Sequence, residues 1–457
     1  MRSFHSGYCQ SALIVCSIAA ISVIAYLPAV NNFFISDDFT LLFFLNVLDQ
    51  EPGYIFNWPS EFFRLISYVY FWLCFKAFGL NSEPYYWAGI ALHAVASLLV
   101  YVLVKKLTRH SLAAWAAAVF FAAYERHHEA VMWISAANST IVTLSCLVFL
   151  IMWERALARG TLARITIALA LFAVALFSKE SAAALAPVTM VGLVLRGYSA
   201  RDVFRKSLPL MAMLSAFGLF WISQAGRNFF VYDGHYALSL HFFPVYARSL
   251  ARLFSQTLPF LAALFVIRKR WPQASASEPP WNSFWIFFAA LVAFAVVPPS
   301  FLTYLDHIPS RNTYFPSVGL AGLVGMLFAT LYGHRPSARF RAGCMLFLFA
   351  IVTANISYIW LKKDPQFLER AAPTRQLIHI LNDSGVEAGR QTPIYVCGFP
   401  LPPWIGATTI AGFTKLNRTD VVFSDTCNKE TDGTTLRWDQ DNGGYATIAP
   451  RHIGAAK

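Results

Sequence analysis

Two adjacent carboxylates, Asp37 and Asp38, follow the stretch Asn31-Asn-Phe-Phe-Ile-Ser36. Adjacent carboxylates in a partly dehydrated place repel each other, so one of them should have a raised pKa and could accept a proton from an attacking hydroxyl. A divalent cation is an alternative, because hard cations prefer carboxylate oxygens. A purely structural interpretation also exists, in which Ser36 and the two Asp residues open a helix over residues 39–48.

Other ionisable side chains collect in short polar segments between apolar runs. Such groups are costly at membrane depth and are therefore candidates for function. His127 or His128 with Glu129 could hold an anion or orient a base, or the cluster is a solvated hairpin. The segments are Glu125-Arg-His-His-Glu129, Ser178-Lys-Glu-Ser181, residues 227–235 and Asp306-His-Ile-Pro-Ser-Arg311.

Two further pairs of charged residues belong either to a functional site or to the protein surface. Lys179 and Glu180 form either part of a site or a hairpin at the water interface. Arg248 and Arg252 share a helix face that suits a phosphate, unless their side chains extend to the outer surface. Carboxylates and cations together suit an anionic, lipid-borne substrate that reacts with a hydroxyl.

The elements that must position these groups follow from composition. The chain has 457 residues, of which 57% are hydrophobic and 13% charged, whereas about a quarter of a typical soluble domain is charged. Apolar runs recur near the length of about 20 residues that crosses a bilayer. This composition excludes an ordinary soluble enzyme and predicts an all-α polytopic membrane protein. The seven cysteines form no zinc-binding or CxxC pattern.

About eleven transmembrane helices are predicted, some of them short. Their ranges are 11–30, 84–104, 111–124, 130–152, 164–177, 181–196, 207–223, 247–267, 282–299, 314–332 and 342–361.

The net charge of +12 would suggest nucleic acid in a soluble protein, but the basic residues alternate between loops. One set of loops holds seventeen Lys and Arg residues and the opposite set holds six. The positive-inside rule therefore predicts an inner amino terminus and an outer carboxyl terminus. No nucleic-acid partner is expected. The basic-rich set is Arg2, Lys105, Lys106, Arg109, Arg155, Arg159, Arg164, Arg196, Arg201, Arg205, Lys206, Arg268, Lys269, Arg270, Arg335, Arg339 and Arg341, and the opposite set is Arg64, Lys76, Arg126, Lys179, Arg227 and Arg311.

Two outer segments complete the predicted organisation of a transmembrane domain over 1–361 and a small extracytoplasmic α/β domain over 362–457. Residues 31–83 form a large, acidic first outer loop, whose part 62–80 is expected to be an amphipathic helix on the outer membrane surface. In the tail, residues 366–382 predict a helix and residues 393–398 a strand. Cys397 and Cys427 lie in the oxidising outer compartment and could form a disulfide.

Five segments in order resemble the GT-C glycosyltransferase superfamily over about residues 10 to 330, with the closest likeness to protein O-mannosyltransferases and to transmembrane mannosyltransferases that carry tetratricopeptide repeats. Those repeats are absent here, and the tail matches nothing in the resemblance. The segments are Ile35-Ser-Asp-Asp-Phe-Thr, Phe63-Arg-Leu-Ile-Ser-Tyr with Phe78-Gly-Leu-Asn and Leu92-His93, His127-His-Glu-Ala-Val-Met-Trp-Ile-Ser-Ala-Ala-Asn138, Ser178-Lys-Glu-Ser, and Arg311-Asn-Thr-Tyr-Phe-Pro-Ser.

The resemblance implies transfer of a sugar from a polyprenyl-phosphate donor to an acceptor hydroxyl on the outer face, with inversion. It implies that Asp37 is the base and that Asp38 supports it. It also implies that Arg64, Lys179 and Arg311 lie near the donor phosphate. The residues implied to shape the site are His93, His127, Glu129 and Glu180.

The sequence also allows expectations about the acceptor, the cofactor, the alternative functions and the cellular location. The acceptor is a protein, a lipid or a glycan, and no cofactor is required, although Asp37 and Asp38 could hold a divalent cation. A transporter or flippase of lipid-linked saccharides is the alternative function, but no convincing internal repeat supports it. An inactive scaffold is a third possibility. Without an organelle signal, the expected location is a bacterial inner membrane, with a cytoplasmic amino terminus and a periplasmic carboxyl terminus.

Overall fold

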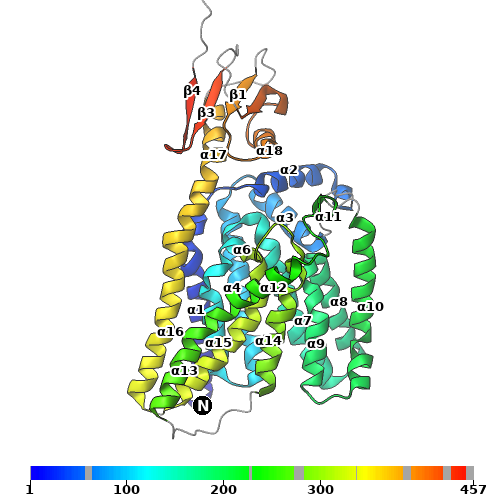
Figure 1. The fold of residues 1–457 in the computed structure, drawn as a ribbon, viewed down its shortest axis with the longest axis vertical. Coiled ribbons are helices and arrows are strands. Elements are labelled where there is room, and N and C mark those ends of the chain that lie inside the picture. The colour runs from blue at the N-terminus through cyan, green and yellow to red at the C-terminus, as the bar shows by residue number, and fades with distance from the viewer. Residues whose placement is uncertain are drawn as a thin grey trace, which may run out of the picture.

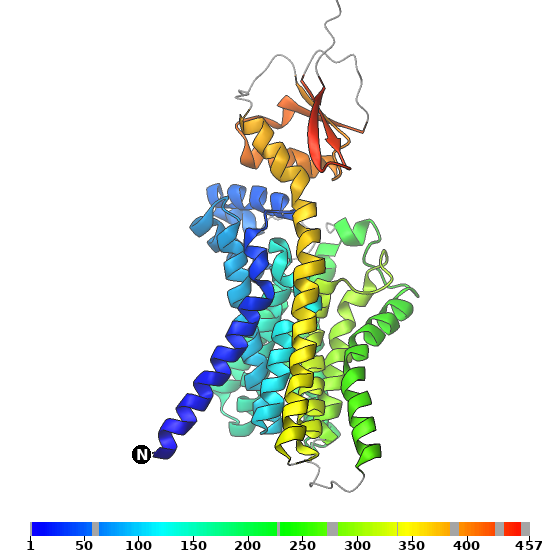
Figure 2. The same cartoon turned by 90° about the vertical axis from the view of Figure 1, so that its left-hand side faces the viewer.

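Long helices run side by side through most of the molecule, and a small unit with a sheet stands at one end (Figure 1). The computed structural model describes residues 2–56, 64–225, 229–271, 282–335, 337–383, 393–425 and 434–448. The amino terminus lies at the end of the bundle opposite the sheet (Figure 2). This arrangement agrees with termini on opposite sides of a membrane, although which side is outer stays a prediction.

The apolar runs form helices, as predicted, and the chain is an integral membrane protein. Among the described residues, eight helical segments are long and apolar enough to cross a bilayer. Three more predicted spans are shorter apolar helices, Ser111–Ala123, Leu162–Ser178 and Glu180–Val194, so the count of eleven stays a prediction. The eight segments are Ser11–Asn31, Glu83–Thr108, Ile134–Ala158, Ala200–Ser223, Phe242–Arg270, Asn282–Phe301, Pro316–Gly333 and Ala338–Asp383.

The described helices divide into those of the bundle and those at the end nearest the sheet, which is called the outer end after the predicted orientation. The bundle comprises α1 (Arg2–Tyr26), α4 (Glu83–Thr108), α5 (Ser111–Ala123), α7 (Asn138–Arg159), α8 (Leu162–Ser178), α9 (Leu185–Val194), α10 (Ala200–Ala225), α12 (Phe242–Phe254), α13 (Leu258–Arg270), α14 (Asn282–Val296), α15 (Pro316–Gly333) and α16 (Ala338–Tyr358). The others are α2 (Asp37–Gln50), α3 (Leu65–Phe78), α6 (His128–Met132), α11 (Phe229–Tyr232), α17 (Asp364–Asp383) and α18 (Pro403–Phe413).

Small residues let the central helices approach closely. The helix α15 is almost wholly buried, and three of its glycines, Gly319, Gly322 and Gly325, lie directly against neighbouring helices. A Cβ added at Gly325 would collide with the carbonyl oxygen of Ala113 and the side chain of Ala117, both in α5. A Cβ at Gly322 would collide with the ring of Phe288 in α14. Close packing of this kind replaces the hydrophobic driving force that helices lack inside lipid.

The predicted span over 130–152 is broken near its outer end. The chain forms α6, turns through Trp133 in an extended conformation (φ −124°, ψ 114°), and begins α7 only at Asn138 after the short 3₁₀ turn Ile134–Ala137. Neither Gly nor Pro marks this break, so periodicity alone could not detect it. The break places the residues of the turn at the outer end of the bundle.

The first outer loop contains two helices, α2 and α3, which pack against each other. The helix expected over 62–80 is α3, whose position on the membrane surface stays a prediction. The helix α2 begins at Asp37, two residues before the predicted start. Ser36 precedes it with φ 45°, a left-handed conformation that is uncommon for a residue other than glycine.

The tail contains a four-stranded sheet in the order β2-β1-β3-β4. Strand β1 (Ile394–Cys397) is parallel to β2 (Val421–Ser424) and β3 (Thr435–Asp439), and β4 (Gly444–Ile448) is antiparallel to β3. The predicted helix and strand are confirmed as α17 and β1. A separate apolar core holds this unit together, and it comprises Leu377, Leu381, Ile394, Val396, Ile410, Leu416, Val421 and Leu436.

The tail joins the bundle by a continuous helix and by an aromatic contact. The predicted boundary between residues 361 and 362 falls in a π-helical segment, Ile359–Lys363, which links α16 to α17. The ring of Phe413 in α18 lies 5.4 Å from that of Phe39 in α2, centroid to centroid. Cys397 is disulfide-bonded, whereas Cys427, its predicted partner, lies outside the described residues.

We expect Gly325→Ala to destabilise the protein, because the added methyl group would meet the backbone of α5. Overpacking of this kind typically costs about 1–3 kcal/mol, and it should appear as a lower Tm of the detergent-solubilised protein. Gly333→Ala is the matched control, because Gly333 lies in the same helix and a Cβ there meets nothing within 4 Å. Equal Tm values for the two variants would show that close contact between α15 and α5 is not required.

Candidate functional site

A pocket of about 220 Å³ lies at the outer end of the bundle, where α2, α3 and the loops after α8 and α14 meet. Most of the predicted charged residues line it. The lining is Asp37, Thr40, Leu41, Arg64, Ser67, Tyr68, Phe71, Trp133, Ser135, Ala136, Asn138, Lys179, Glu180, Tyr236, Pro299, Leu302, Tyr304, Arg311, Asn312 and Trp404. Residues that lie far apart in the chain therefore meet in one place.

Asp37 presents an unengaged carboxylate to this pocket. Its side chain is exposed there, and it forms no hydrogen bond or ion pair with any residue of the described ranges. The walls of the pocket exclude part of the water around the Asp37 carboxyl, and this desolvation raises its pKa, while the nearby Arg311 guanidinium lowers it. A carboxylate with a raised pKa and free oxygens can accept a proton.

Asp38 plays a different part from its neighbour, because its carboxylate is fully buried and bonded to backbone. One oxygen accepts the N–H of Ile35 at 3.0 Å, and the other accepts the N–H of Ser135 at 2.7 Å. The second bond ties the first outer loop to the broken segment before α7. Asp38 therefore fixes the start of α2, and with it the position of Asp37.

The environment of Asp38 also decides its protonation. Burial raises the pKa of Asp38 to about 7, although the N–H groups of Ile35 and Ser135 act in the opposite direction. Asp38 is fully buried and both of its oxygens accept backbone hydrogen bonds, so that of the pair only Asp37 lines the pocket. The described residues contain no cluster of three or more His, Cys, Asp or Glu side chains that could hold a metal ion.

Arg64 reaches the pocket in a bidentate ion pair. Its Nη2 lies 3.0 Å from Oε1 of Glu180, and its Nε donates to Oε2 at 3.2 Å. Such forked pairs fix both side chains in orientation. Two predicted residues, 116 positions apart, are thus brought together at the start of α3 and the end of α8.

Lys179 is buried beneath the same pocket without a carboxylate bonded to it in the described structure. Its ammonium nitrogen donates to Oγ of Ser139 and to Oδ1 of Asn312, each at 2.8 Å. Burial, together with the neighbouring Arg64, lowers the pKa of Lys179 well below its ordinary value. An anion in the pocket would restore its proton, since an opposite charge favours the charged form.

Arg311 is the third cation of the pocket. Its backbone N–H donates to Oε2 of Glu129 at 3.1 Å, and its guanidinium lies 3.5 Å from the same oxygen. The guanidinium also lies over the ring of Trp133, 5.0 Å from its centroid. Glu129 thus holds Arg311 from outside the pocket lining, and its role in shaping the site stays a prediction.

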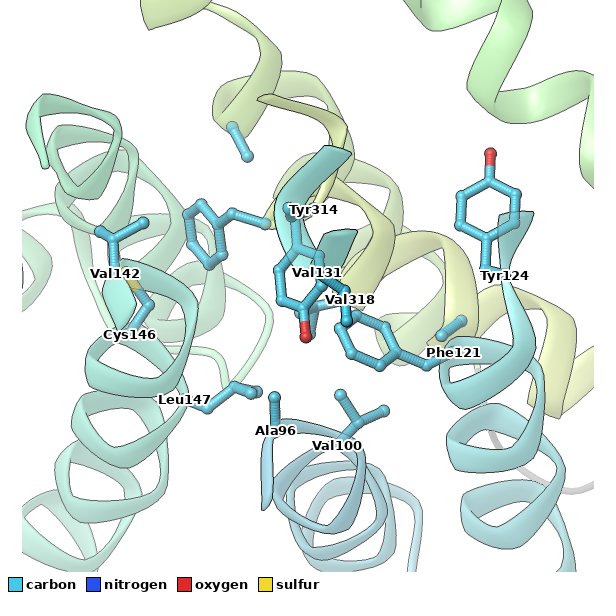
Figure 3. Packing of buried hydrophobic residues seen from close by; sticks show 14 of the residues in the cluster. Ala96, Val100, Phe121, Tyr124, Val131, Val142, Cys146, Leu147, Tyr314 and Val318 are labelled. Atoms are coloured by element: carbon cyan, nitrogen blue, oxygen red, sulfur yellow. The ribbon is translucent and has the colours of Figure 1, made fainter. Parts of the chain in front are cut away.

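His93 and His127 lie below the pocket and do not line it. Nε2 of His93 donates to the carbonyl of Ala122 at 2.9 Å, so its Nδ1 accepts the hydroxyl of Tyr314 at 2.6 Å. His127 bonds Oγ of Ser317 at 2.6 Å. Tyr314 points into the packed centre among Val131, Phe121 and Val318 (Figure 3). The two histidines therefore contact the segment that follows Arg311 and lie outside the pocket lining.

Several lining residues escaped the sequence analysis. Thr40 Oγ1 and Trp133 Nε1 are buried polar atoms without a hydrogen-bond partner in the described ranges, which is unusual in folded proteins. Tyr304 and Trp404 are 46% and 51% exposed at the pocket. Only the spacing of Thr40, one helical turn after Asp37, could have suggested any of them.

Two predicted basic residues lie elsewhere. Arg248 pairs with Asp306 at 2.9 Å on the exposed surface. Arg252 lies near Arg126 and Glu125. Burial raises the pKa of the Glu125 carboxyl, and the charges of Arg126 and Arg252 act in the opposite direction. Neither arginine lines the pocket.

Comparison with known proteins agrees with the predicted superfamily. Residues 65–223 match the family described as dolichyl-phosphate-mannose-protein mannosyltransferase. That stretch includes Lys179 and Glu180 but neither Asp37, Arg64 nor Arg311. No curated protein sequence matches the chain significantly.

A solved structure shares the fold. It is the crystal structure of the Archaeoglobus fulgidus oligosaccharyltransferase, tethered by a disulfide bond to an acceptor peptide containing the NVT sequon. The match has a TM-score of 0.50 and 13% sequence identity, and it covers 90% of this chain and 64% of that chain. This chain therefore spans less than two thirds of that protein's length. The predicted likeness to GT-C glycosyltransferases is confirmed.

We expect Asp38→Asn to destabilise the protein, because an amide nitrogen would then face one of two backbone N–H groups. Leaving a buried donor unpaired costs about 1–3 kcal/mol, which a lower Tm in detergent should report. Asp37→Asn is the matched control, since Asp37 bonds nothing in the described structure.

The same pair of variants tests the pKa of Asp38. A carboxyl whose pKa is raised from 3.8 to about 7 by folding binds its proton more tightly in the folded state. The free energy of unfolding should therefore fall as the pH rises from 3.8 through about 7. A similar fall in Asp38→Asn would assign the effect to another group.

Proposed function

We propose that this protein is a glycosyltransferase that moves a sugar from a polyprenyl-phosphate donor to an acceptor hydroxyl on the outer face of a membrane. One observation carries the proposal. A single pocket contains an unengaged carboxylate, Asp37, together with the guanidinium groups of Arg64 and Arg311 and the buried amine of Lys179. The expected setting is a bacterial inner membrane, with the amino terminus in the cytoplasm and the tail domain, residues 362–457, in the periplasm.

The proposed reaction is a direct displacement with inversion. Asp37 removes the proton of the acceptor hydroxyl, and that oxygen attacks the anomeric carbon from the side opposite the phosphate. The bond between the anomeric carbon and the phosphate oxygen breaks, and its electron pair leaves with the polyprenyl phosphate. The proton remains on Asp37 until water removes it. Residues of the chain supply every group in this scheme, so it includes no metal ion.

The negative charge of the leaving phosphate explains why the pocket contains basic residues. The leaving phosphate gains negative charge as the bond breaks, and fixed cations in a site with little water stabilise such charge strongly. Arg64 and Arg311 are held in place by Glu180 and Glu129, so little reorganisation is needed. Lys179, whose pKa burial lowers, would become charged as the phosphate arrives.

The residues around these groups support the same scheme. His93 and His127 support Tyr314 and Ser317 from below, which fits a positioning role. The lipid tail of the donor would lie along the apolar helices, while the acceptor, a protein, lipid or glycan, would enter from water. No feature of the described residues favours the transporter alternative.

Asp37→Asn should abolish transfer, because the amide cannot accept the proton. Loss of a general base typically slows a reaction by about 10²- to 10⁴-fold. The measurement is transfer of radiolabelled mannose from a short-chain polyprenyl-phosphate donor by the purified protein in detergent. Because burial raises the pKa of Asp37, native activity should fall on acidification at a pH above the ordinary carboxyl range. Retained activity in this variant, at an unchanged Tm, would remove Asp37 as the base.

Arg311→Lys should raise the KM for the donor, because lysine retains the charge but loses the planar fork that binds phosphate. We expect a rise of about tenfold, near the lower end for a hydrogen bond to a charged group. Arg248→Lys is the matched control, because that arginine is paired on the surface outside the pocket. An equal KM for the two variants would argue against contact between Arg311 and the phosphate.

A further inference from the structure

One residue of the tail domain, Trp404, reaches the pocket. All other lining residues in the described ranges lie before residue 313, within the predicted transmembrane domain. Trp404 stands at the start of α18, directly after Pro402 and Pro403. Its side chain is 51% exposed, although a ring of this size usually finds apolar cover.

The exposure of Trp404 does not result from a loosely held helix. The next residue, Ile405, is buried in the main core, and the ring of Phe413 at the other end of α18 packs on Phe33, Phe34 and Phe39. Within the helix, Oγ1 of Thr408 donates to the carbonyl of Ile405 at 2.9 Å. A helix anchored at both ends thus holds an uncovered ring at the pocket.

We propose that Trp404 is a specificity-determining residue that binds a sugar ring of the acceptor. This inference rests on the proposed function, because only a glycosyltransferase has an acceptor. A pyranose has an apolar face of C–H groups and an edge of hydroxyls. The indole would cover the apolar face, and the exposed ring of Tyr304 belongs to the same lining. Hydroxyl and amide groups of Ser135, Asn138 and Asn312 also line the pocket and suit the hydroxyl edge.

The place of Trp404 assigns it to the acceptor and not to the donor. The cations that suit the donor phosphate belong to the bundle, at the ends of α3, α8 and α15. Trp404 comes from the unit beyond the bundle, at the end opposite the amino terminus (Figure 2). A lipid-linked donor reaches the pocket from the membrane side, so the tail side remains for the acceptor.

The lining favours a saccharide over a peptide. Proteins commonly bind an extended peptide through the main chain of an exposed strand edge. No lining residue in the described ranges belongs to one of the four strands. The pocket instead offers aromatic rings with hydroxyl, amide and carboxylate groups, a combination typical of small polar ligands.

The test measures binding and transfer separately on the full-length purified protein. Binding of mannobiose, cellobiose and chitobiose is measured without donor by saturation-transfer difference NMR, with a Ser/Thr-rich peptide as the competing class. Transfer to the same probes is then measured with a short-chain polyprenyl-phosphate mannose. We expect Trp404→Ala to weaken disaccharide binding and to raise the acceptor KM by about tenfold or more, the effect of losing one aromatic contact of about 1.4 kcal/mol. The donor KM should stay unchanged.

Two variants control for damage to the tail. Trp404→Phe keeps an aromatic face and should restore most of the disaccharide binding. Trp438→Ala removes a tryptophan of the same unit that packs on Tyr445, with ring centroids 5.0 Å apart, and that does not line the pocket. This variant should bind disaccharides as the native protein does, and an equal loss in it would attribute the effect to unfolding of the tail.

The outcomes separate this inference from the proposed function. Disaccharide binding that depends on Trp404, without transfer in any variant, would reject the proposed function and keep the sugar-binding role. Three results would overturn the inference: no disaccharide binding to the native protein, binding unchanged in Trp404→Ala, or dependence on Trp404 for the peptide alone. A rise in donor KM in Trp404→Ala would instead assign the ring to the donor.

Discussion

Inside a bilayer the peptide backbone has no water to bond, and every N–H and C=O group must find a partner within the protein. This constraint makes the membrane part helical and forces its helices to pair through small residues such as Gly322 and Gly325. It also confines irregular backbone and charge to the ends of the helices. The pocket lies at such an end, where the broken segment at Trp133 and the loop before α15 bring polar groups together.

A second constraint acts within the pocket. Both carboxylate oxygens of Asp38 accept backbone hydrogen bonds. One N–H group comes from its own loop, and the other comes from Ser135, 97 residues away. The adjacent Ser36 adopts a positive φ, a strained conformation that persists only where the surroundings impose it. The strained residue and the buried carboxylate together hold Asp37 at the pocket with its own oxygens unengaged.

The other charged groups around the pocket are matched by partners. Glu180 orients Arg64, Glu129 orients Arg311, and neutral oxygens of Ser139 and Asn312 receive the protons of Lys179. Because Glu180 and Glu129 fix the two guanidinium groups in advance, an arriving phosphate would meet positive charge without rearrangement, and Lys179 would gain its proton at the same time. The tail adds an aromatic surface at the same place, so the pocket is completed by a part of the chain outside the predicted transmembrane domain.

Composition and local pattern determined much about this protein. Low charge and long apolar runs predicted the helical membrane class, and the tail helix and first strand were also predictable, because these features depend on residues close together in the chain. Asp37, Arg64, Lys179, Glu180 and Arg311 were recognised from short motifs, and the structure brings them to one pocket.

Tertiary structure alone decided what each of them contacts there. Asp37 and Asp38 differ because the N–H of Ser135 bonds only Asp38. His93 and His127 bond Tyr314 and Ser317 below the pocket. Trp404, which also lines the pocket, belongs to a unit without a recognisable motif. Such contacts join residues 97 or more positions apart, and local periodicity carries no information about them.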